Sequence, residues 1–549
     1  MSAGDPSGAA RVPVATYRVQ LTKDFNVRRL IDAVEYLHSL GITDVYTSPF
    51  LVARAGSQHG YDVIDHRSID PAIGDDDAMA DLHRALDARG MGLMVDVVPN
   101  HMCVNTNDNL WWNDVLENGP SSPFAKYFDI EWRPPKAELH DKVLLPILGD
   151  QYGRVLENAE LQLREDGGAL MVDYGDRRLP IGPSTYSRVL RRALERLQRD
   201  PPGDNRVIEE LESIMTAADH LPDRSEKSPE KVRERQREKE IVKSRLKSLL
   251  ADHPEGRAAF DAALTAINGQ KGDPRSFDPL EELLGQQAYR LSFWRVAAEQ
   301  INYRRFFEIN DLAAIRIEEP EVLEAVHTKL FELLRRGFVT ALRVDHVDGL
   351  REPRQYLADL AERTRRPYVV VEKILAIGER LPETWPCAGT TGYDFLNLVN
   401  GLFVAPAGEK SLRAIYDGLR TVKGTYEDVV FESKRLVLQA SMSSELLVLA
   451  RRLERISEQH RWSRDFTVGT LARVLTDTVA CFPVYRTYVA SGDVEVAPQD
   501  VRHILTALRG GKRRSPSVNL SAFDFLGDVL LMHDPDGITE EQRAERRDF

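Results

Sequence analysis

Hydrophobic positions along this chain recur in one unit, an amphipathic helix followed by a short apolar strand. In "NVRRLIDAVEYLHSLGITDVYTSP", residues 26–49, apolar side chains return every three or four positions and then form a β-rich run. Gly41 separates the two parts, as a glycine at the end of a helix does. The pattern predicts a helix that packs its apolar face on a sheet containing the strand that follows.

Three further segments repeat this unit, at 78–100, 321–347 and 354–374. The first two keep the glycine, as Gly90 and Gly337, and the third has Pro367 in its place. Helices that alternate with apolar strands imply crossover connections and a parallel sheet. With "ATYRVQL" near the start and "GYDFLNLV" at 392–399, the sequence predicts about six strands.

Acidic residues stand at the C-terminal ends of three of these strands, as Asp96, Asp345 and Glu372. In a (β/α)8 barrel, catalytic residues from several strands meet at that edge. No glycine-rich phosphate-binding turn follows the first strand, which weakens the alternative of a dinucleotide-binding sheet. We therefore predict an α/β protein with a (β/α)8 barrel of the TIM type, of which about six strands are present.

Two long segments interrupt the repeated unit. We expect the first part of the barrel in 1–105 and its continuation, with the nucleophile and acid/base candidates, in 291–405. Mainly helical insertions are expected in 106–290 and 406–549. The charged run 225–250 is predicted to form a solvent-exposed helix or helical hairpin, because glutamates interleaved with its basic residues argue against a nucleic-acid-binding arm.

Composition narrows the function classes. A length of 549 residues with 42% hydrophobic and 29% charged residues is ordinary for a soluble globular protein, and the net charge of −13 argues against nucleic-acid binding. Three scattered cysteines indicate a reducing compartment and no disulfide framework. No apolar stretch approaches the roughly 18 residues that a membrane span requires. We expect a cytoplasmic protein that binds neither nucleic acid nor membrane.

The pattern around Asp345 indicates glycosidase-type chemistry. Side chains alternate along a strand, so Arg343 and Asp345 face the same way, and the guanidinium favours the ionised carboxylate that a nucleophile needs. Glu372 follows three valines on the next strand, and apolar surroundings suit a general acid. Two such carboxyl groups, roughly 5–5.5 Å apart, are the minimum for a retaining glycosidase. A buried ion pair with Arg343 is the structural alternative.

Several motifs at these strand ends resemble the α-amylase-type glycoside hydrolases. Three of the four signature regions of that family are similar to "DVVPNH" at 96–101, "LRVDH" at 342–346 and "VVEK" at 370–373. Within the family, the maltooligosyltrehalose synthases are resembled most in "TYRVQL" at 16–21, "SPFLVARAGSQHGYDV" at 48–63 and the segment 289–318.

The resemblance implies a barrel of the α-amylase kind and a defined reaction. The enzyme would convert the reducing-end α-1,4 linkage of a maltooligosaccharide into an α,α-1,1 linkage, which forms a maltooligosyl trehalose by a retaining double displacement. Asp345 would be the nucleophile and Glu372 the acid/base. The implied substrate is an α-1,4-glucan, and no cofactor is implied. An α-amylase-type hydrolase and a catalytically impaired glucan-binding protein remain the alternatives.

The same resemblance assigns the residues around the sugar. Expected to contact it are Tyr61, Asp62, His101, Arg343 and His346. Expected to organise the loops of the site are Asp96 and Asn100, with Asp348 as a turn former. The simpler readings of Asp62 and His101 are a turn aspartate and a structural histidine. We predict no metal, because His346 has no second histidine or cysteine at metal-ligand spacing.

The fourth signature region of the family, a histidine–aspartate pair that closes the seventh strand, is not matched. His140–Asp141 precedes the nucleophile, and His533–Asp534 is followed by Pro-Asp-Gly, which predicts a turn. The chain thus resembles about the first two-thirds of such an enzyme, without strands seven and eight or a C-terminal β-domain. Because an open barrel exposes a sheet edge, a second polypeptide that completes it is one hypothesis. A fragment and an inactive glucan-binding remnant are the others.

Overall fold

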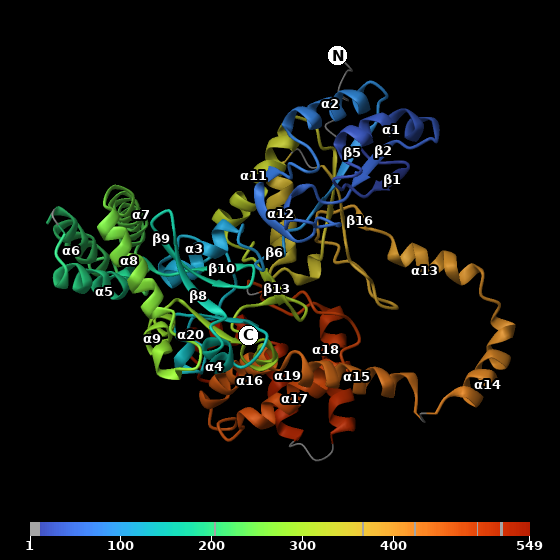
Figure 1. Cartoon of the computed structure of the whole chain (residues 1–549). Coiled ribbons are helices and arrows are strands. Elements are labelled where there is room, and N and C mark those ends of the chain that lie inside the picture. Colours follow the sequence, from blue (N-terminus) through green and yellow to red (C-terminus); the bar gives the residue numbers. More distant parts are fainter. Residues whose placement is uncertain (1–10, 203–204, 365–366, 422–423, 491, 516–519) are drawn as a thin grey trace.

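A parallel sheet of six strands, which we call the central sheet, lies in the upper part of Figure 1, near the N-terminus. The computed structural model describes residues 11–202, 205–364, 367–421, 424–490, 492–515 and 520–549. In spatial order the strands are β1 (Thr16–Val19), β2 (Asp44–Thr47), β5 (Gly92–Val97), β14 (Ala341–Val344), β15 (Tyr368–Val371) and β16 (Gly389–Thr390). All five pairings are parallel, as predicted. Among the described residues, neither β1 nor β16 pairs with a further strand on its outer side.

The predicted helix precedes the predicted strand in all four copies of the repeated unit. The helices are α1 (Val27–Ser39), α2 (Asp76–Asp87), α11 (Pro320–Arg335) and α12 (Pro353–Arg363). Each buries one apolar face, which in α1 consists of Val27, Leu30, Val34 and Leu37. Gly41 has a φ of 89° and Gly337 a φ of 74°, so both occupy the left-handed region that favours glycine after a helix.

The prediction of a strand at 392–399 is wrong. These residues belong to α13 (Tyr393–Leu402), and the sixth strand, β16, ends just before them. A short apolar run does not distinguish a strand from a helix, and here Gly392, with a φ of 99°, turns the chain into the helix. α13 and α14 (Glu409–Leu419) extend away from the rest of the molecule (Figure 1), and neither contains a buried residue.

The segment 393–419, which we call the arm, exposes many large apolar side chains. On α13 and just after it these are Tyr393, Phe395, Leu396, Leu398, Leu402, Phe403 and Val404. On α14 they are Leu412, Ile415, Tyr416 and Leu419. Contiguous apolar surface of this kind is typical of an interaction surface, whereas scattered apolar residues are not.

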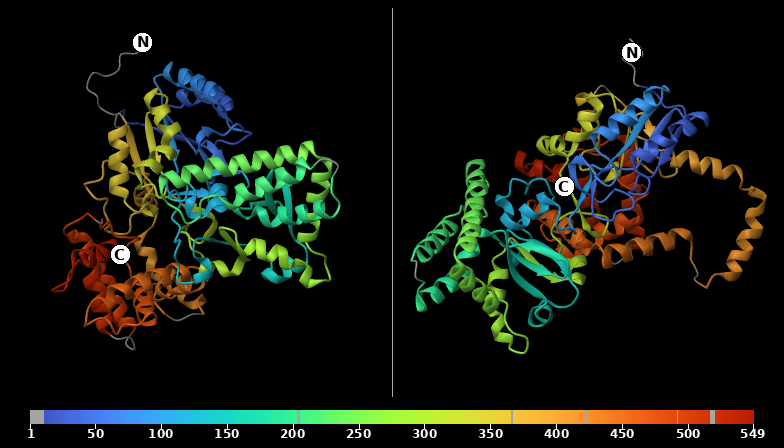
Figure 2. Two further views of the ribbon diagram at one scale, coloured as in Figure 1. Left: turned by 90° about the vertical axis from the view of Figure 1, so that its left-hand side faces the viewer. Right: turned by 45° about the horizontal axis from the view of Figure 1, so that its top comes forward.

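The first insertion contains strands that the sequence did not lead us to expect. Its helical bundle consists of α5 (Tyr186–Arg199), α6 (Arg206–Asp219), α7 (Pro229–Asp252) and α8 (Pro254–Ile267), which stand apart from the central sheet (Figure 2). Beside it lies an antiparallel sheet of β8 (Leu161–Asp166), β9 (Ala169–Tyr174) and β10 (Arg177–Pro180). Gly167 and Gly168, with φ values of 60° and 87°, form the β8–β9 turn. This glycine pair was the available hairpin signal.

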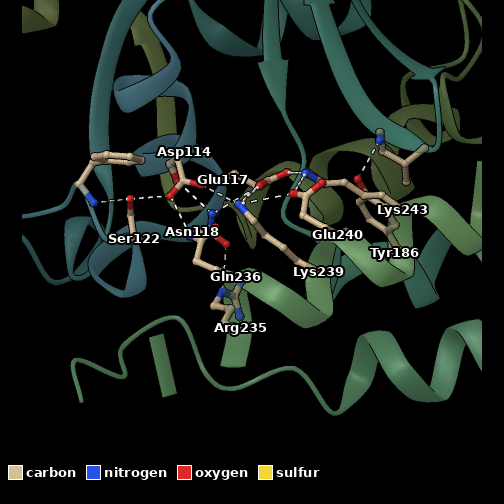
Figure 3. A network of polar contacts seen from close by, with 12 residues as sticks. Asp114, Glu117, Asn118, Ser122, Tyr186, Arg235, Gln236, Lys239, Glu240 and Lys243 are labelled. Carbon is tan, nitrogen blue, oxygen red and sulfur yellow. Dashed lines mark hydrogen bonds and ion pairs between the residues drawn. The ribbon is translucent and has the colours of Figure 1, made fainter. Parts of the chain in front are cut away.

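One face of α7 is buried, which corrects the expectation that the charged run is solvent-exposed throughout. Lys239 Nζ donates to Asp114 Oδ2 at 2.6 Å and to Glu117 Oε2 at 2.7 Å, both on α3 (Leu110–Asn118) (Figure 3). Arg235 Nε donates to Asn118 Oδ1 at 3.0 Å. Charges that would be costly alone are therefore paired, and they hold α7 against α3.

The last part of the chain is helical, as predicted, and has a hydrophobic core of its own. Its helices are α15 (Tyr426–Ala440), α16 (Ser443–Glu458), α17 (Val468–Ala480), α18 (Pro498–Arg514), α19 (Leu520–Leu530) and α20 (Glu540–Asp548). The buried Arg305 binds this unit to the rest of the molecule through Glu445 Oε1 at 2.7 Å and Ser441 O at 3.1 Å. In the described part of the chain, no helix combines the length and apolar character of a membrane span.

Candidate active site

Asp96, Asp345 and Glu372 lie together at the C-terminal edge of three adjacent strands. The register places Arg343 beside Asp96, and the N–H of Glu372 donates to the carbonyl of Val344 at 2.9 Å. Parallel strands bring side chains at equivalent positions to one edge of a sheet. The prediction that Arg343 and Asp345 face the same edge is confirmed by an ion pair of 2.7 Å between them.

The guanidinium of Arg343 forms ion pairs with all three carboxyl groups. Arg343 Nη1 lies 2.7 Å from both Asp96 Oδ1 and Asp345 Oδ1, and Nη2 lies 2.9 Å from Glu372 Oε1. Although burial lowers it, the pKa of Arg343 is raised by these acidic neighbours, Asp96 first among them. Three carboxyl groups around one cation leave the cluster with an excess of negative charge when all are ionised.

Asp345 is less readily ionised than the sequence led us to expect. Burial, together with the charges of Asp96 and Glu372, raises the pKa of Asp345 to about 7, although Arg343 acts to lower it. The sequence pattern indicates only the guanidinium beside it. Loss of solvent and two neighbouring carboxylates outweigh a cation that Asp345 shares.

Glu372 lies in ionic surroundings, so the expectation of an apolar environment is wrong. Its side chain is 25% exposed, pairs with Arg343, and accepts a hydrogen bond from the N–H of His346 at 3.0 Å. The preceding valines do not surround it, because side chains alternate along β15. Val369 and Val371 join the main core on one face, while Glu372 lies on the other face with Val370.

Asp96 accepts hydrogen bonds from two tyrosines and pairs with Arg343. The Tyr61 hydroxyl donates to Asp96 Oδ2 at 2.5 Å and the Tyr46 hydroxyl donates to the same oxygen at 3.0 Å. Burial raises the pKa of Asp96, against the opposing effects of Arg343 and these hydrogen bonds. Tyr46 was missed by sequence reasoning. So was Arg18, whose Nη2 donates to the Tyr61 hydroxyl at 3.2 Å, although it belongs to the "TYRVQL" motif.

The structure places His101 behind Tyr61. His101 Nε2 lies 3.2 Å from the carbonyl oxygen of Tyr61, and burial lowers the pKa of His101 to about 3, so its imidazole is neutral. Asn100 contacts the other ring nitrogen at 3.4 Å. Asp62 is buried, accepts a hydrogen bond from the Ser57 hydroxyl, and keeps an oxygen, Oδ2, without a hydrogen-bond partner in the described residues. That oxygen lies 3.4 Å from Arg54.

His346 has an unusual backbone conformation at the end of β14. Its φ of 43° lies in the left-handed region, which is uncommon outside glycine. Its ring packs against Phe306 and Phe307, with centroid distances of 5.0 and 5.2 Å. Asp348 follows in the short turn Val347–Gly349, as predicted. The two phenylalanines were missed individually, although they lie in the segment that carried the resemblance.

The His533–Asp534 pair is engaged within the C-terminal helical unit. Asp534 Oδ2 accepts from Arg543 at 2.9 Å and Asp534 Oδ1 from Arg546 at 3.1 Å, and both arginines belong to α20. These contacts give Asp534 a structural role, because they bind α20 to the turn that precedes it. In the described ranges, no group of three or more histidine, cysteine or acidic residues is arranged to hold a metal ion.

Comparisons with known proteins show which enzymes this chain is similar to. The family model for the alpha-amylase catalytic domain matches residues 25–154. The chain is 32% identical over 412 residues to a putative maltooligosyl trehalose synthase of Mycobacterium tuberculosis, which covers 74% of this chain and 40% of that protein. The solved structure of maltooligosyltrehalose synthase from Arthrobacter ramosus matches 97% of the chain with a TM-score of 0.69 and 31% identity. Over most of its length, this chain is similar to maltooligosyltrehalose synthases.

The likeness to these synthases confirms the predicted fold class, with the six parallel strands as part of an α-amylase-type barrel. A second solved protein, the DSM5389 glycosyltrehalose synthase, matches with a TM-score of 0.64 and 27% identity. The chain spans 40% of the curated synthase and 55% of the Arthrobacter ramosus structure. About half the length of a synthase is therefore represented, which is less than the two-thirds expected from the motifs.

Proposed function

We propose that this chain catalyses intramolecular transglycosylation on maltooligosaccharides, in which a reducing-end α-1,4 linkage becomes an α,α-1,1 linkage. The observation that carries the proposal is the guanidinium of Arg343, which binds Asp345 and Glu372 at the ends of neighbouring strands. The likeness to maltooligosyltrehalose synthases over most of the chain supports the same reaction. A cytoplasmic location belongs to the proposal and rests on three cysteines that are all free.

Asp345 is the proposed nucleophile and Glu372 the proposed acid/base. The Asp345 carboxylate attacks the anomeric carbon, and the glycosidic C–O bond breaks as Glu372 gives its proton to the departing oxygen. The freed glucose turns and attacks the same carbon through its anomeric hydroxyl, whose proton returns to Glu372 as the bond to Asp345 breaks. Retention of the glucose and exclusion of water separate this isomerisation from hydrolysis.

Four further residues are proposed to contact the sugar, namely Tyr61, Asp62, His101 and His346. Asp62 Oδ2, which pairs with Arg54 at 3.4 Å but accepts no hydrogen bond in the described residues, suits a hydroxyl donor. Neutral His101, on the far side of Tyr61, can donate or accept without adding charge. Arg343 is proposed to hold the two reacting carboxyl groups, with Asp96 and Asn100 organising the loops around them.

Maltopentaose distinguishes the proposed reaction from its alternatives. With the chain present, we expect the reducing-end signal to fall while total glucan stays constant, because an α,α-1,1 product has no reducing end. A reducing-sugar assay with chromatography of the products measures both quantities, and Asp345→Asn serves as the inactive control. A rise in reducing ends would show a hydrolase. Oligosaccharide binding without turnover would show a glucan-binding protein.

We further propose that a second polypeptide segment completes the barrel. The support is the outer edges of β1 and β16, which pair with no further strand among the described residues, together with the apolar arm that follows β16. Parallel strands are normally covered on both faces and flanked by helices. The expected partner therefore supplies parallel strands that pair with the two edges. It also supplies an apolar face that covers the arm. The remaining half of a synthase would meet both requirements.

Separate production of the unmatched half of the Arthrobacter ramosus synthase tests this proposal. We expect a one-to-one complex with the chain in sedimentation analysis, and activity on maltopentaose that rises when the two are mixed. The double variant Leu398→Asp/Leu402→Asp, with sites 72% and 82% exposed, should weaken the complex at least about 10-fold through lost apolar burial. Lys410→Glu, a polar change on the same arm, is the matched control. Association of the chain only with itself would contradict the proposal.

A further inference from the structure

Lys373 is a buried lysine that directly follows the proposed acid/base. Its side chain is 1% exposed and lies 2.9 Å from both Asp348 Oδ2 and Glu379 Oε1. A buried ammonium group is costly unless it is paired, and here two carboxylates pair with it. The reaction proposed above gives Lys373 no role, so its position calls for another explanation.

Both partners of Lys373 lie in loops that border Glu372. Asp348 belongs to the turn Val347–Gly349, which comes directly after His346, and the N–H of His346 donates to Glu372 Oε2 at 3.0 Å. Glu379 accepts a hydrogen bond from the N–H of Ala376 at 2.8 Å and so closes the loop after β15. Lys373 therefore connects the turn that follows His346, whose amide contacts the Glu372 carboxyl group, with the loop after β15.

A segment from the C-terminal helical unit closes this arrangement from outside. The Tyr488 hydroxyl donates to Asp348 Oδ1, and its ring lies 5.5 Å from the Lys373 ammonium. Arg486 donates to the carbonyl oxygens of Asp348 at 3.0 Å and Leu350 at 2.5 Å. The turn that carries the His346 amide is thus fixed from both sides, by Lys373 within the barrel and by Arg486 and Tyr488 from the segment between α17 and α18.

We propose that Lys373 is the positioning residue of the acid/base: it holds the turn after β14 so that the His346 amide fixes the Glu372 carboxyl group towards the departing oxygen. Lys373 does not touch the substrate and acts only through Asp348 and Glu379. The proposal rests on the proposed function, in which Glu372 protonates the leaving group. Loss of Lys373 should therefore harm reactions that need this proton more than reactions that do not.

Two donors separate positioning from general structural damage. Maltotetraose needs a proton on its departing sugar oxygen, whereas α-maltosyl fluoride releases fluoride with little acid assistance. For Lys373→Met we expect turnover of maltotetraose to fall about 100-fold, the lower end of what general acid catalysis contributes. Reaction with the fluoride should fall less than about 5-fold, and Lys373→Arg should recover most of the loss. An equal fall with both donors, or no fall, would overturn the proposal.

Lys329→Met is the matched control, because Lys329 is also a buried lysine that pairs with two carboxylates. Its Nζ lies 3.1 Å from Asp76 Oδ1 and 2.6 Å from Glu332 Oε2, between α2 and α11. Because the Asp76 and Glu332 side chains are 55% and 33% exposed, Lys329→Met should lose less stability than Lys373→Met, and it should keep the wild-type ratio of the two donor rates. A ratio that changes equally in both variants would show that any buried lysine has this effect.

An activity-independent measurement decides the case in which the wild-type chain reacts with neither donor. That outcome would count against the proposed function of the chain alone. With ¹⁵N-histidine labelling, the chain gives 13 histidine amide signals, and His346→Gln identifies the one of interest. We expect Lys373→Met to shift the His346 signal, and Lys373→Arg and Lys329→Met to leave it near its wild-type position. An unchanged His346 signal in Lys373→Met would overturn the positioning role whatever the activity.

Discussion

Replacing Asp345 with asparagine is expected to abolish glycosyl transfer and, at pH 8, to make the chain more stable. An amide cannot form the glycosyl-enzyme bond, so kcat/KM on maltooligosaccharides should fall by at least about 10³-fold. The same change removes one of three carboxyl groups that share Arg343. Relief of that crowding should raise the free energy of unfolding by about 0.5–2 kcal/mol, because sites built for activity are seldom optimal for stability.

The stabilisation by Asp345→Asn should depend on pH in a defined direction. An aspartate in the unfolded chain titrates near about 3.9, whereas the pKa of Asp345 in the folded chain is raised to about 7. Between these values the unfolded state loses its proton first, so stability falls as pH rises. The penalty is absent below about pH 4, grows towards about pH 7, and is constant above that. The variant lacks this penalty, so its advantage should follow the same course.

Urea denaturation at pH 5 and pH 8 measures that course. The gain in unfolding free energy should be larger at pH 8 than at pH 5. Asp87→Asn, an exposed position on α2, is the control and should change stability by less than about 0.5 kcal/mol at either pH. A variant that is less stable than wild type at pH 8, or whose advantage shrinks as pH rises, would contradict the charge crowding around Arg343. The activity of the wild-type chain should fall as pH drops below about 7, because protonated Asp345 is no nucleophile.

The parts of the fold that the sequence revealed are those where one local pattern decides the structure. The four helix–strand units carried both a helical period and a stop at glycine or proline, and all four formed as predicted. The 392–399 segment showed only an apolar run, which does not distinguish a strand from a helix. Gly392, whose backbone lies in the left-handed region, turns the chain into a helix there. The hairpin at Gly167 and Gly168 could have been predicted from these two turn glycines. The face that α7 buries could not have been predicted in this way, because it depends on carboxylates more than 100 positions earlier in the chain.

In the candidate site, the directions of the side chains could be predicted from the sequence, but the pKa of the nucleophile candidate could not. Strand alternation correctly placed Arg343 with Asp345, because the period of two needs no tertiary information. The pKa of Asp345 depends on burial and on Asp96 and Glu372, which only the assembled sheet brings near. Lys373 was hidden for a related reason. A lysine after a strand reads as a surface residue until the carboxylates that pair with it are known.

Replacing Lys239 with methionine is expected to lower the free energy of unfolding by about 3–5 kcal/mol, because it leaves two poorly solvated carboxylates without their shared cation. The Asp114 and Glu117 side chains are 15% and 8% exposed. Burial raises the pKa of Glu117, but Lys239 and Lys243 outweigh it and lower the pKa, so Glu117 stays charged at neutral pH. Without Lys239, that charge keeps only Lys243 as its ion-pair partner in the described residues.

The loss on replacing Lys239 should appear first where α7 meets α3. Both faces of this contact are seen in Figure 3, where Asp114, Glu117 and Asn118 meet Arg235 and Lys239. We expect trypsin to cut the basic helix α7 faster in the variant, before urea unfolds the central sheet. Lys231→Met, which removes an exposed pair on the same helix, should cost less than about 1 kcal/mol. If both variants lost the same small amount of unfolding free energy, the buried charges would not be what holds α7 against α3. The exposed charges of α7 would then matter as much as the buried ones.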